Sequence, residues 1–239
     1  MFSQNLFRCV VLLTVTGIVL LAAQPAKADI VTVLFNGFNP GDPSGMDEFK
    51  VTLDSNFAAD FPELSHSSQV FEHHQRNQAF NFINSHSQVD KLFVAGFSWG
   101  GNALIRLATE LLLPAGIMVD ATFQFDSVEL FDGGLGDDVL PSNVINGYNF
   151  FQIPTGFLEP GGEQNVVGAL NVNAEVFFND SSITHTSIDN DVRLHKLFNS
   201  RMRTIVIIAN SPVNPQNVPE PQTAGLILIG LAVLHLRHR

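Results

Sequence analysis

The chain has 239 residues, 45% hydrophobic and 15% charged, so it is long enough for one domain with a large core and too apolar to be disordered. Its formal net charge of −11 argues against nucleic acid or anionic lipid headgroups as partners and favours neutral or cationic substrates. The single cysteine, Cys9, precedes the predicted domain, which excludes thiol catalysis and cysteine-ligated zinc there.

Residues 1–28 have the pattern of a secretory signal peptide. Arg8 provides a basic start, an apolar run extends from Cys9 to Ala23, and Ala26-Lys27-Ala28 is a small-x-small cleavage site. The alternative is an N-terminal membrane anchor. We expect cleavage after Ala28 and export of a protein without disulfide bonds.

Strands and helices alternate in the pattern of residues 29–210. Apolar and β-branched runs predict strands at 30–35, 68–71, 91–96, the end of 116–126 and 146–153, with 173–178 as a further candidate. Helices are predicted at 46–60, 74–86, 101–113 and 190–200, and 204–209 is predicted as a last strand or a helix end. The alternation favours an α/β fold with a mostly parallel sheet and helices on both faces.

One serine lies between two glycines where a predicted strand meets a predicted helix. The segment reads Gly96-Phe97-Ser98-Trp99-Gly100. A serine hydroxyl needs a base to remove its proton and donors to hold the oxyanion that its attack creates. A strand–serine–helix turn exposes the hydroxyl beside the N–H groups of a helix N-terminus, so we predict Ser98 to be a nucleophile. The alternative is a serine that only caps the helix.

With this motif, residues 30–210 resemble a small α/β-hydrolase of the lipase and esterase type. The resemblance implies a triad in the chain order serine, acid, histidine, with the acid at the end of a later strand and the histidine in a loop near the C-terminus. The resemblance also implies that the protein cleaves esters through an acyl-enzyme, without a cofactor or a metal.

Two histidines follow Ser98 before the C-terminal tail, and His185 is the favoured base. It lies in the polar segment Ser182–Asp191, as a loop histidine should, whereas His195 falls in the predicted helix at 190–200. Four earlier histidines precede the serine, and we expect them to be solvent-exposed, with a place at the mouth of the site as the alternative: His66, His73, His74 and His86.

Asp126 is the favoured acid because it ends the apolar strand that follows the serine motif. Its role would be to hold the histidine tautomer and to stabilise the imidazolium. Asp120 belongs to the same run, but it lies nearer the start of the strand. Asp189 and Asp191 are close to His185 in sequence, and we expect both to have structural roles.

The oxyanion hole is predicted to use two backbone N–H groups. One belongs to Trp99, directly after the nucleophile, and the other to Phe38, in the loop after the first strand. Lipases often have a histidine before the glycine of that loop, and this chain has Asn36. We assign no metal, because Gly133–Asp138 fits a calcium-binding repeat only once.

The C-terminus has three parts in a specific order. A Pro-rich linker, 211–217, leads to Val218-Pro219-Glu220-Pro221, a short apolar stretch to Leu236 and a basic end. Residues 218–239 resemble a PEP-CTERM sorting signal. The resemblance implies processing by an exosortase-type enzyme, transient membrane association through this segment, and sorting to the periplasm, outer surface or extracellular matrix of a Gram-negative-type bacterium. The alternative is a simple tail anchor.

Two functions are compatible with these features. The first is a secreted or surface-sorted serine hydrolase acting on small-molecule or lipid esters through Ser98, Asp126 and His185. The second is a non-catalytic surface or matrix protein that keeps the hydrolase fold for binding. The complete set of triad residue types in family order favours the enzyme.

Overall fold

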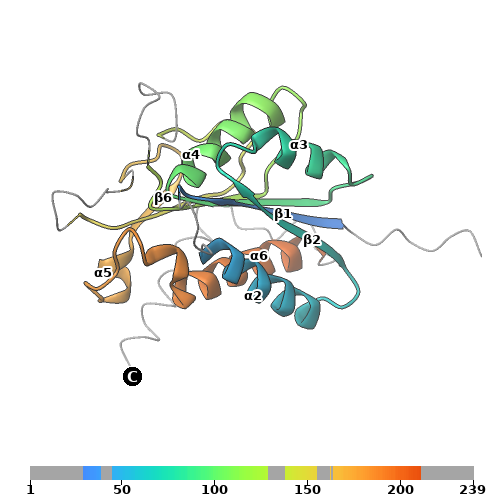
Figure 1. Cartoon of the computed structure of the whole chain (residues 1–239). Coiled ribbons are helices and arrows are strands. Elements are labelled where there is room, and N and C mark those ends of the chain that lie inside the picture. The colour runs from blue at the N-terminus through green and yellow to red at the C-terminus, as the bar shows by residue number, and fades with distance from the viewer. Residues whose placement is uncertain (1–28, 39–44, 129–137, 155–161, 163, 211–239) are drawn as a thin grey trace, which may run out of the picture. The chain divides into compact units, whose positions relative to one another are not determined.

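The computed structural model describes residues 29–38, 45–128, 138–154, 162 and 164–210 (Figure 1). The predicted signal peptide (1–28), linker (211–217) and sorting segment (218–239) lie outside the described residues, as does nearly all of the glycine-rich patch at 132–138. The chain divides after Phe198 into a large unit and a short one that contains the end of the last helix. The fold below is that of the large unit.

A six-stranded sheet, parallel throughout, forms the centre of this unit (Figure 1). The strands lie side by side in the order β2-β1-β3-β4-β5-β6. Their bounds are β1 Asp29–Asn36, β2 Ser65–Glu72, β3 Lys91–Phe97, β4 Ala121–Phe125, β5 Gly147–Phe151 and β6 Leu170–Asn173. The five strands predicted with regular patterns are therefore present, and the α/β class is confirmed.

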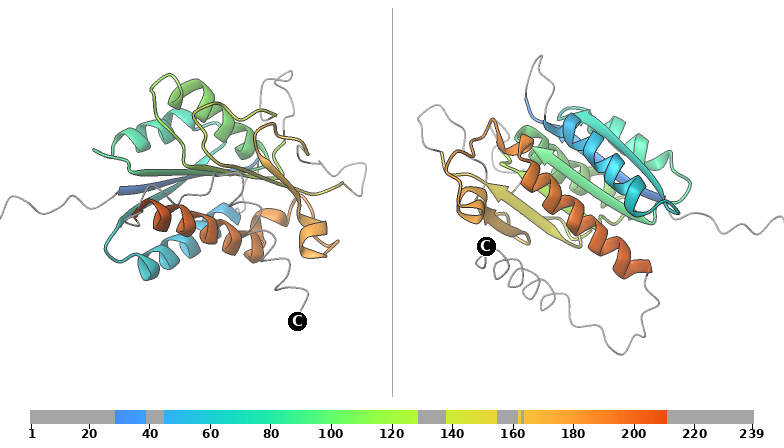
Figure 2. Two further views of the ribbon diagram at one scale, coloured as in Figure 1. Left: turned by 180° about the vertical axis from the view of Figure 1, so that it is seen from behind. Right: turned by 90° about the horizontal axis from the view of Figure 1, so that it is seen from below.

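Helices cover both faces of the sheet, as Figure 2 shows. The helices α3 (Arg76–Asn84) and α4 (Trp99–Arg106) lie on one face, and α4 continues into a π-helical segment, η1 (Leu107–Leu112). The helix α2 (Gly45–Asp60) and the first turns of α6 (Val192–Asn210), up to Phe198, lie on the other. The short helices α5 (Ala174–Phe178) and η2 (Ile188–Asn190) belong to the connection between β6 and α6.

The central strands are buried on both faces, which explains why they read as continuous apolar runs. Val31, Val33 and Phe35 of β1 join the core cluster that contains residues of α3, α4 and η1. The opposite face holds an aromatic cluster in which Phe49 of α2 contacts Phe125 of β4 and Phe198 of α6. The two hydrophobic layers fix the sheet between its helices.

One predicted element differs from the structure. Residues 173–178 are not a strand: β6 ends at Asn173, whose side-chain oxygen accepts a hydrogen bond from the Val176 N–H and caps α5. The β-branched and aromatic residues of this segment favour a strand by composition, but its helical hydrogen bonds prevail. Residues 204–209 form the end of α6, which is one of the two alternatives predicted for them. Within the described ranges, no helix has the length and apolarity needed to cross a membrane.

Candidate active site

Polar residues gather where the central parallel strands end. Ser98 follows β3, Asp126 follows β4, and Gln152 follows β5, while Gly37 and Phe38 follow β1. The chain runs from β1 to β2 on one side and from β3 to β4 on the other, so the connections that follow the neighbouring strands β1 and β3 leave in opposite directions. Ligands of open α/β sheets bind in the crevice at such a switch point, beyond the carboxyl ends of the strands.

Ser98 occupies a strained turn between β3 and α4. Its backbone has φ 53° and ψ −123°, a conformation that side-chain-bearing residues rarely adopt. The turn is held in place because the Ser98 N–H donates to the Phe125 carbonyl at 3.0 Å and the Ser98 carbonyl accepts from the Val128 N–H at 3.2 Å. Both bonds link the turn to β4 and the residues after it.

The two glycines of the motif allow the turn to close. A Cβ atom at position 96 would lie 2.1 Å from the Gly100 carbonyl oxygen, and one at position 100 would lie 2.3 Å from the Phe35 carbonyl oxygen. Any larger residue would push α4 away from β3 and β1. The spacing of glycines around Ser98 therefore reflects the close approach of this helix to two strands.

Ser98, His185 and Asp126 form one hydrogen-bonded line, which we call the Ser98 triad. The Ser98 Oγ and the His185 Nε2 are 2.9 Å apart, and the His185 Nδ1 and the Asp126 Oδ2 are 2.6 Å apart. All three residues are buried, with 6% of Ser98 exposed. With Asp126 ionised, Nδ1 carries the proton and donates to it, which leaves Nε2 to accept from the serine hydroxyl.

Asp126 is fixed by more partners than the sequence indicates. Its backbone is left-handed, with φ 47°, and its N–H donates to the Phe150 carbonyl. Its Oδ1 accepts from the backbone N–H groups of Gln152 and Gly162, and its Oδ2 accepts from the Gln152 side chain. A fully buried carboxylate is tolerated only with such donors. Sequence reasoning missed Gln152 and Gly162, because it did not include the strand order that places β5 beside β4.

The other candidate acids have different partners. Asp120 lies at the opposite edge of the sheet, where it binds Lys91 Nζ at 2.6 Å and the Leu92 N–H at 2.9 Å. The Asp189 carboxylate accepts from the Gly45 N–H at the start of α2, at 2.9 Å. Burial raises the pKa of Asp189 to about 6.

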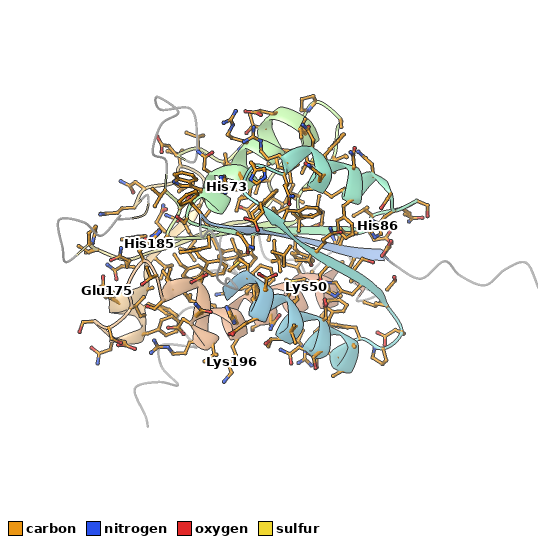
Figure 3. The ribbon with its side chains drawn as sticks, viewed as in Figure 1. Lys50, His73, His86, Glu175, His185 and Lys196 are labelled. Atoms are coloured by element: carbon orange, nitrogen blue, oxygen red, sulfur yellow. The ribbon has the colours of Figure 1, made fainter. Side chains whose placement is uncertain are left out.

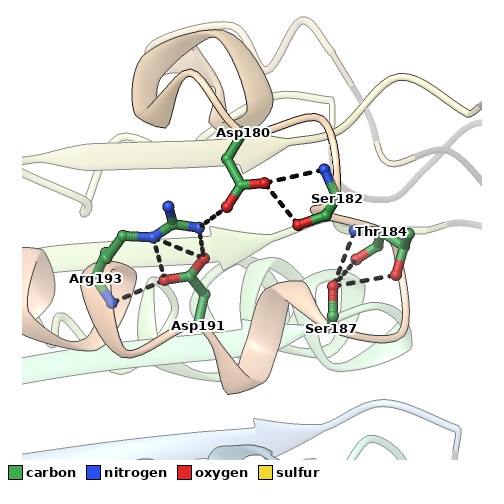
Figure 4. Close-up of polar contacts among 6 residues, drawn as sticks. All are labelled: Asp180, Ser182, Thr184, Ser187, Asp191 and Arg193. Carbon is green, nitrogen blue, oxygen red and sulfur yellow. Dashed lines mark hydrogen bonds and ion pairs between the residues drawn. The ribbon is translucent and has the colours of Figure 1, made fainter.

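A polar network holds the loop that carries His185 (Figure 4). Arg193 donates to Asp180 on one side, at 2.8 Å, and to Asp191 on the other, at 2.6 Å. Hydrogen bonds from Ser182 and Arg193 lower the pKa of Asp180 to about 2. Thr184 and Ser187, which flank the histidine, bond each other through the Ser187 Oγ and the Thr184 N–H, at 2.9 Å. The loop is thus restrained on both sides of the imidazole.

Aromatic rings surround the triad. Phe97 contacts the His185 ring with centroids 5.0 Å apart, so it packs the imidazole. Phe38 and Trp99 are the residues whose backbone amides are predicted to hold the oxyanion, and their ring centroids are 4.7 Å apart. Trp99 is the first residue of α4, and N–H groups of a first helical turn have no partner within the helix. A Cβ built at Gly37 would lie 2.9 Å from the Ser98 Cβ, so the β1 loop also borders the nucleophile.

The remaining histidines occupy three different environments. His195 is buried, stacks on Phe49 at 4.4 Å and bonds the Asp189 carbonyl through Nε2. His74 is exposed, as expected, and His73 lies against Trp99 with ring centroids 5.0 Å apart.

The expectation of exposure is wrong for His66, whose side chain is only 7% exposed because it stacks on Phe57. Figure 3 labels His73 and His185 toward one end of the sheet and His86 toward the other.

Among the described residues, no group of three or more His, Cys, Asp or Glu side chains is arranged to hold a metal ion. Neither a scan against protein-family models nor a search of curated proteins finds a match to this chain. The fold and the site define an α/β protein with a hydrogen-bonded serine, histidine and aspartate at the carboxyl edge of a parallel sheet.

Proposed function

We propose that this chain is a serine hydrolase of the α/β-hydrolase type that cleaves carboxylic esters through an acyl-enzyme. The observation that carries the proposal is the line of hydrogen bonds from the Ser98 Oγ through His185 to Asp126. It begins on a strained strand-to-helix turn and ends on a carboxylate with three further hydrogen bonds from its neighbours. A serine that only capped α4 would need neither the imidazole nor the buried acid, and the Ser98 side chain makes no capping bond.

The first half-reaction begins when the Ser98 Oγ attacks the ester carbonyl carbon and its proton passes to the His185 Nε2. Asp126 stabilises the resulting imidazolium and keeps its ring oriented, without taking the proton. The tetrahedral intermediate collapses when the bond to the alcohol oxygen breaks. That oxygen takes the proton from Nε2, and the acyl group remains on Ser98.

The second half-reaction uses water in place of the alcohol. His185 removes a proton from a water molecule, whose oxygen attacks the acyl carbon, and then returns the proton to the Ser98 Oγ as the acid leaves. In both halves the negative oxygen would be held by the backbone N–H groups of Phe38 and Trp99. The contact between their rings supports this pairing because it keeps the β1 loop and the start of α4 together.

We also propose that the enzyme works outside the cytoplasm. The pattern at 1–28 supports export, and the resemblance of 218–239 to a PEP-CTERM signal supports processing by an exosortase-type enzyme and sorting toward the cell surface or matrix. Substrates would then be small-molecule or lipid esters that reach the envelope.

The test is labelling of the purified full-length protein with a fluorophosphonate, followed by an ester panel. We expect the unmodified protein to be labelled and both Ser98→Ala and His185→Ala to lose labelling. Ser55→Ala and His86→Ala serve as matched controls, because Ser55 is exposed on α2 and the His86 Nδ1 bonds the Phe82 carbonyl. A folded protein that is not labelled would contradict the proposal and favour a non-catalytic binding protein with this fold.

A further inference from the structure

Three aromatic rings, two from loops and one from the first residue of α4, meet beside the nucleophile. We call Phe38, His73 and Trp99 the aromatic wall. They follow the carboxyl ends of β1, β2 and β3. The ring centroids of Phe38 and Trp99 are 4.7 Å apart, those of His73 and Trp99 are 5.0 Å apart, and those of Phe38 and His73 are 6.3 Å apart.

The wall is unusual because part of it faces solvent. Phe38 is 61% exposed, whereas the other Phe, Tyr and Trp side chains among the described residues are buried or partly buried. Six of the largest fully buried side chains are Phe, so this chain otherwise keeps such rings inside. Trp99 is partly exposed as well. Exposed apolar surface that gathers at one place commonly marks a binding site.

The position of the wall ties it to the reaction. Trp99 follows Ser98 directly, and the backbone at Gly37, next to Phe38, approaches the Ser98 Cβ so closely that a Cβ there would lie at 2.9 Å. A substrate whose carbonyl carbon reaches the Ser98 Oγ can therefore extend one of its two portions toward these rings.

The charge of the wall limits what can bind there. Phe38 and Trp99 are neutral, and burial together with His74 lowers the pKa of His73, which favours the uncharged form of its ring. No cation of the wall would hold an anionic group, and the negative π faces of the rings repel one. Phe38 and Trp99 are inclined by 40°, which leaves ring faces at two angles for a flat group to contact.

We infer that the aromatic wall is the subsite for a flat, uncharged aromatic portion of the ester substrate. This inference rests on the proposed function and names its substrate class as neutral aryl-alkyl esters, in preference to aliphatic or anionic ones. The aromatic portion contacts Phe38 and Trp99 while the carbonyl carbon lies at Ser98. Ring–ring contacts of this kind add to the hydrophobic contribution that a saturated ring of the same size would make.

The experiment compares esters that differ only in the saturation of one ring. Benzyl acetate and cyclohexylmethyl acetate test the alcohol side, and methyl 3-phenylpropanoate and methyl 3-cyclohexylpropanoate test the acyl side. For the full-length protein we expect kcat/KM to favour the aromatic member of one pair by about 3- to 10-fold. The pair that shows the preference identifies which side of the ester lies on the wall.

Variants of the wall assign that preference to its rings. Phe38→Leu and Trp99→Leu keep both backbone amides, and we expect each to bring the ratio of the preferred pair toward 1. Phe38→Tyr keeps a ring and should keep the ratio. Phe61→Leu, which changes a partly exposed ring beside Phe57, is the matched control and should leave the ratio unchanged.

The inference and the proposed function fail in different ways. If the protein is labelled by a fluorophosphonate but cleaves both members of each pair equally, or keeps its preference in Phe38→Leu and Trp99→Leu, the aromatic subsite is wrong and the hydrolase stands. A preference for the saturated rings would point to an aliphatic substrate and would also overturn the inference. A folded protein with neither labelling nor hydrolysis would overturn both.

Discussion

The Ser98 triad has a counterpart beneath α2. There a hydroxyl, an imidazole and a carboxylate also lie in one line, and they belong to Thr32, His66 and Asp54. The His66 Nε2 lies 3.1 Å from the Thr32 Oγ1, and its Nδ1 lies 3.4 Å from the Asp54 Oδ1. The corresponding distances in the Ser98 triad are 2.9 and 2.6 Å. Residue types and rough distances alone would therefore describe two candidate sites in one molecule.

The backbone separates the two regions. Thr32 lies within β1, paired with β2 on one side and β3 on the other, and it is fully buried. Its hydroxyl is not exposed to solvent, and the strand N–H groups around it are used in the sheet. Ser98 instead lies on a left-handed turn whose next residue starts a helix, so N–H groups without helical partners face its surroundings. The turn, more than the trio of side chains, distinguishes a nucleophile from a buried hydroxyl.

The carboxylates differ in the same way. Asp54 is partly exposed and shares its oxygens among Lys50, Ser68 and His66. Asp126 has no exposed surface, and besides His185 its only hydrogen-bond donors among the described residues come from Gln152 and Gly162.

Burial lowers the pKa of His66 to about 4, because the charged imidazolium is poorly solvated there. We therefore expect catalysis at Ser98 only.

The largest difference between the regions should appear when each hydroxyl is removed. Ser98→Ala should lower the kcat of ester hydrolysis by about 10⁵- to 10⁶-fold, because no nucleophile remains for the acyl-enzyme. Thr32→Val keeps the shape of the side chain and should leave kcat near that of the unmodified chain. Steady-state kinetics on one ester checks both variants, and a comparable loss in Thr32→Val would end the distinction between the two regions.

The second-largest difference in kcat should appear when the carboxylate of each region is replaced by an amide. Asp126→Asn presents an amide to the His185 Nδ1 and favours the wrong tautomer, so we expect kcat to fall by about 10⁴-fold. The left-handed backbone at this position tolerates Asn, which limits the effect on folding. Asp54→Asn should leave kcat unchanged. If the Asp126→Asn protein is folded by circular dichroism and yet active, the acid has been misassigned.

Each member of the Ser98 triad has a local signal in the sequence. Ser98 has its glycines and a strand-to-helix boundary, Asp126 ends an apolar run, and His185 lies in a polar loop. The structure brings all three side chains together. The strands were predictable for the same reason, since apolar runs of the central strands are buried on both faces.

Features that depend on contacts between distant segments were not predictable. Gln152 reaches Asp126 only because β5 pairs with β4, and the burial of His66 depends on Phe57 stacking over its ring. The prediction of a strand at 173–178 is wrong because it rests on the strand preference of Val and Phe, whereas the Asn173 side chain accepts a capping bond from the Val176 N–H at the start of a helix. Sequence pattern gives the order of elements but not these pairings.

A smaller effect concerns the stability of the region beneath α2 in acid. The pKa of His66 is about 4 in the fold and near 6.5 in the unfolded chain, so the unfolded chain binds more protons between these values. The free energy of unfolding should therefore fall as the pH drops from 6.5 to 4, by about 3 kcal/mol from this residue. His66→Phe should lose this part of the pH dependence in urea unfolding at pH 4, 5 and 7, whereas His86→Ala should retain it.

The loop of the Ser98 triad should show the opposite pH dependence, and the smallest effect. Asp189 is 3% exposed and its pKa is about 6, above the usual 3.8 for this carboxyl, so between these values the folded chain binds more protons than the unfolded chain. From this residue, the free energy of unfolding should fall as the pH rises from 4 to 6, by about 2–3 kcal/mol.

Asp189→Asn tests whether Asp189 causes this pH dependence. The amide oxygen can still accept from the Gly45 N–H, while the titration of the side chain is lost. The variant should gain stability over the unmodified chain at pH 7 and gain little at pH 4, by urea unfolding. Glu63→Gln, which changes an exposed carboxylate, is the matched control and should show no such difference. An equal change at both pH values would mean that Asp189 acts only through its hydrogen bond to α2. A loss confined to pH 7 would mean that its ionised form stabilises the loop.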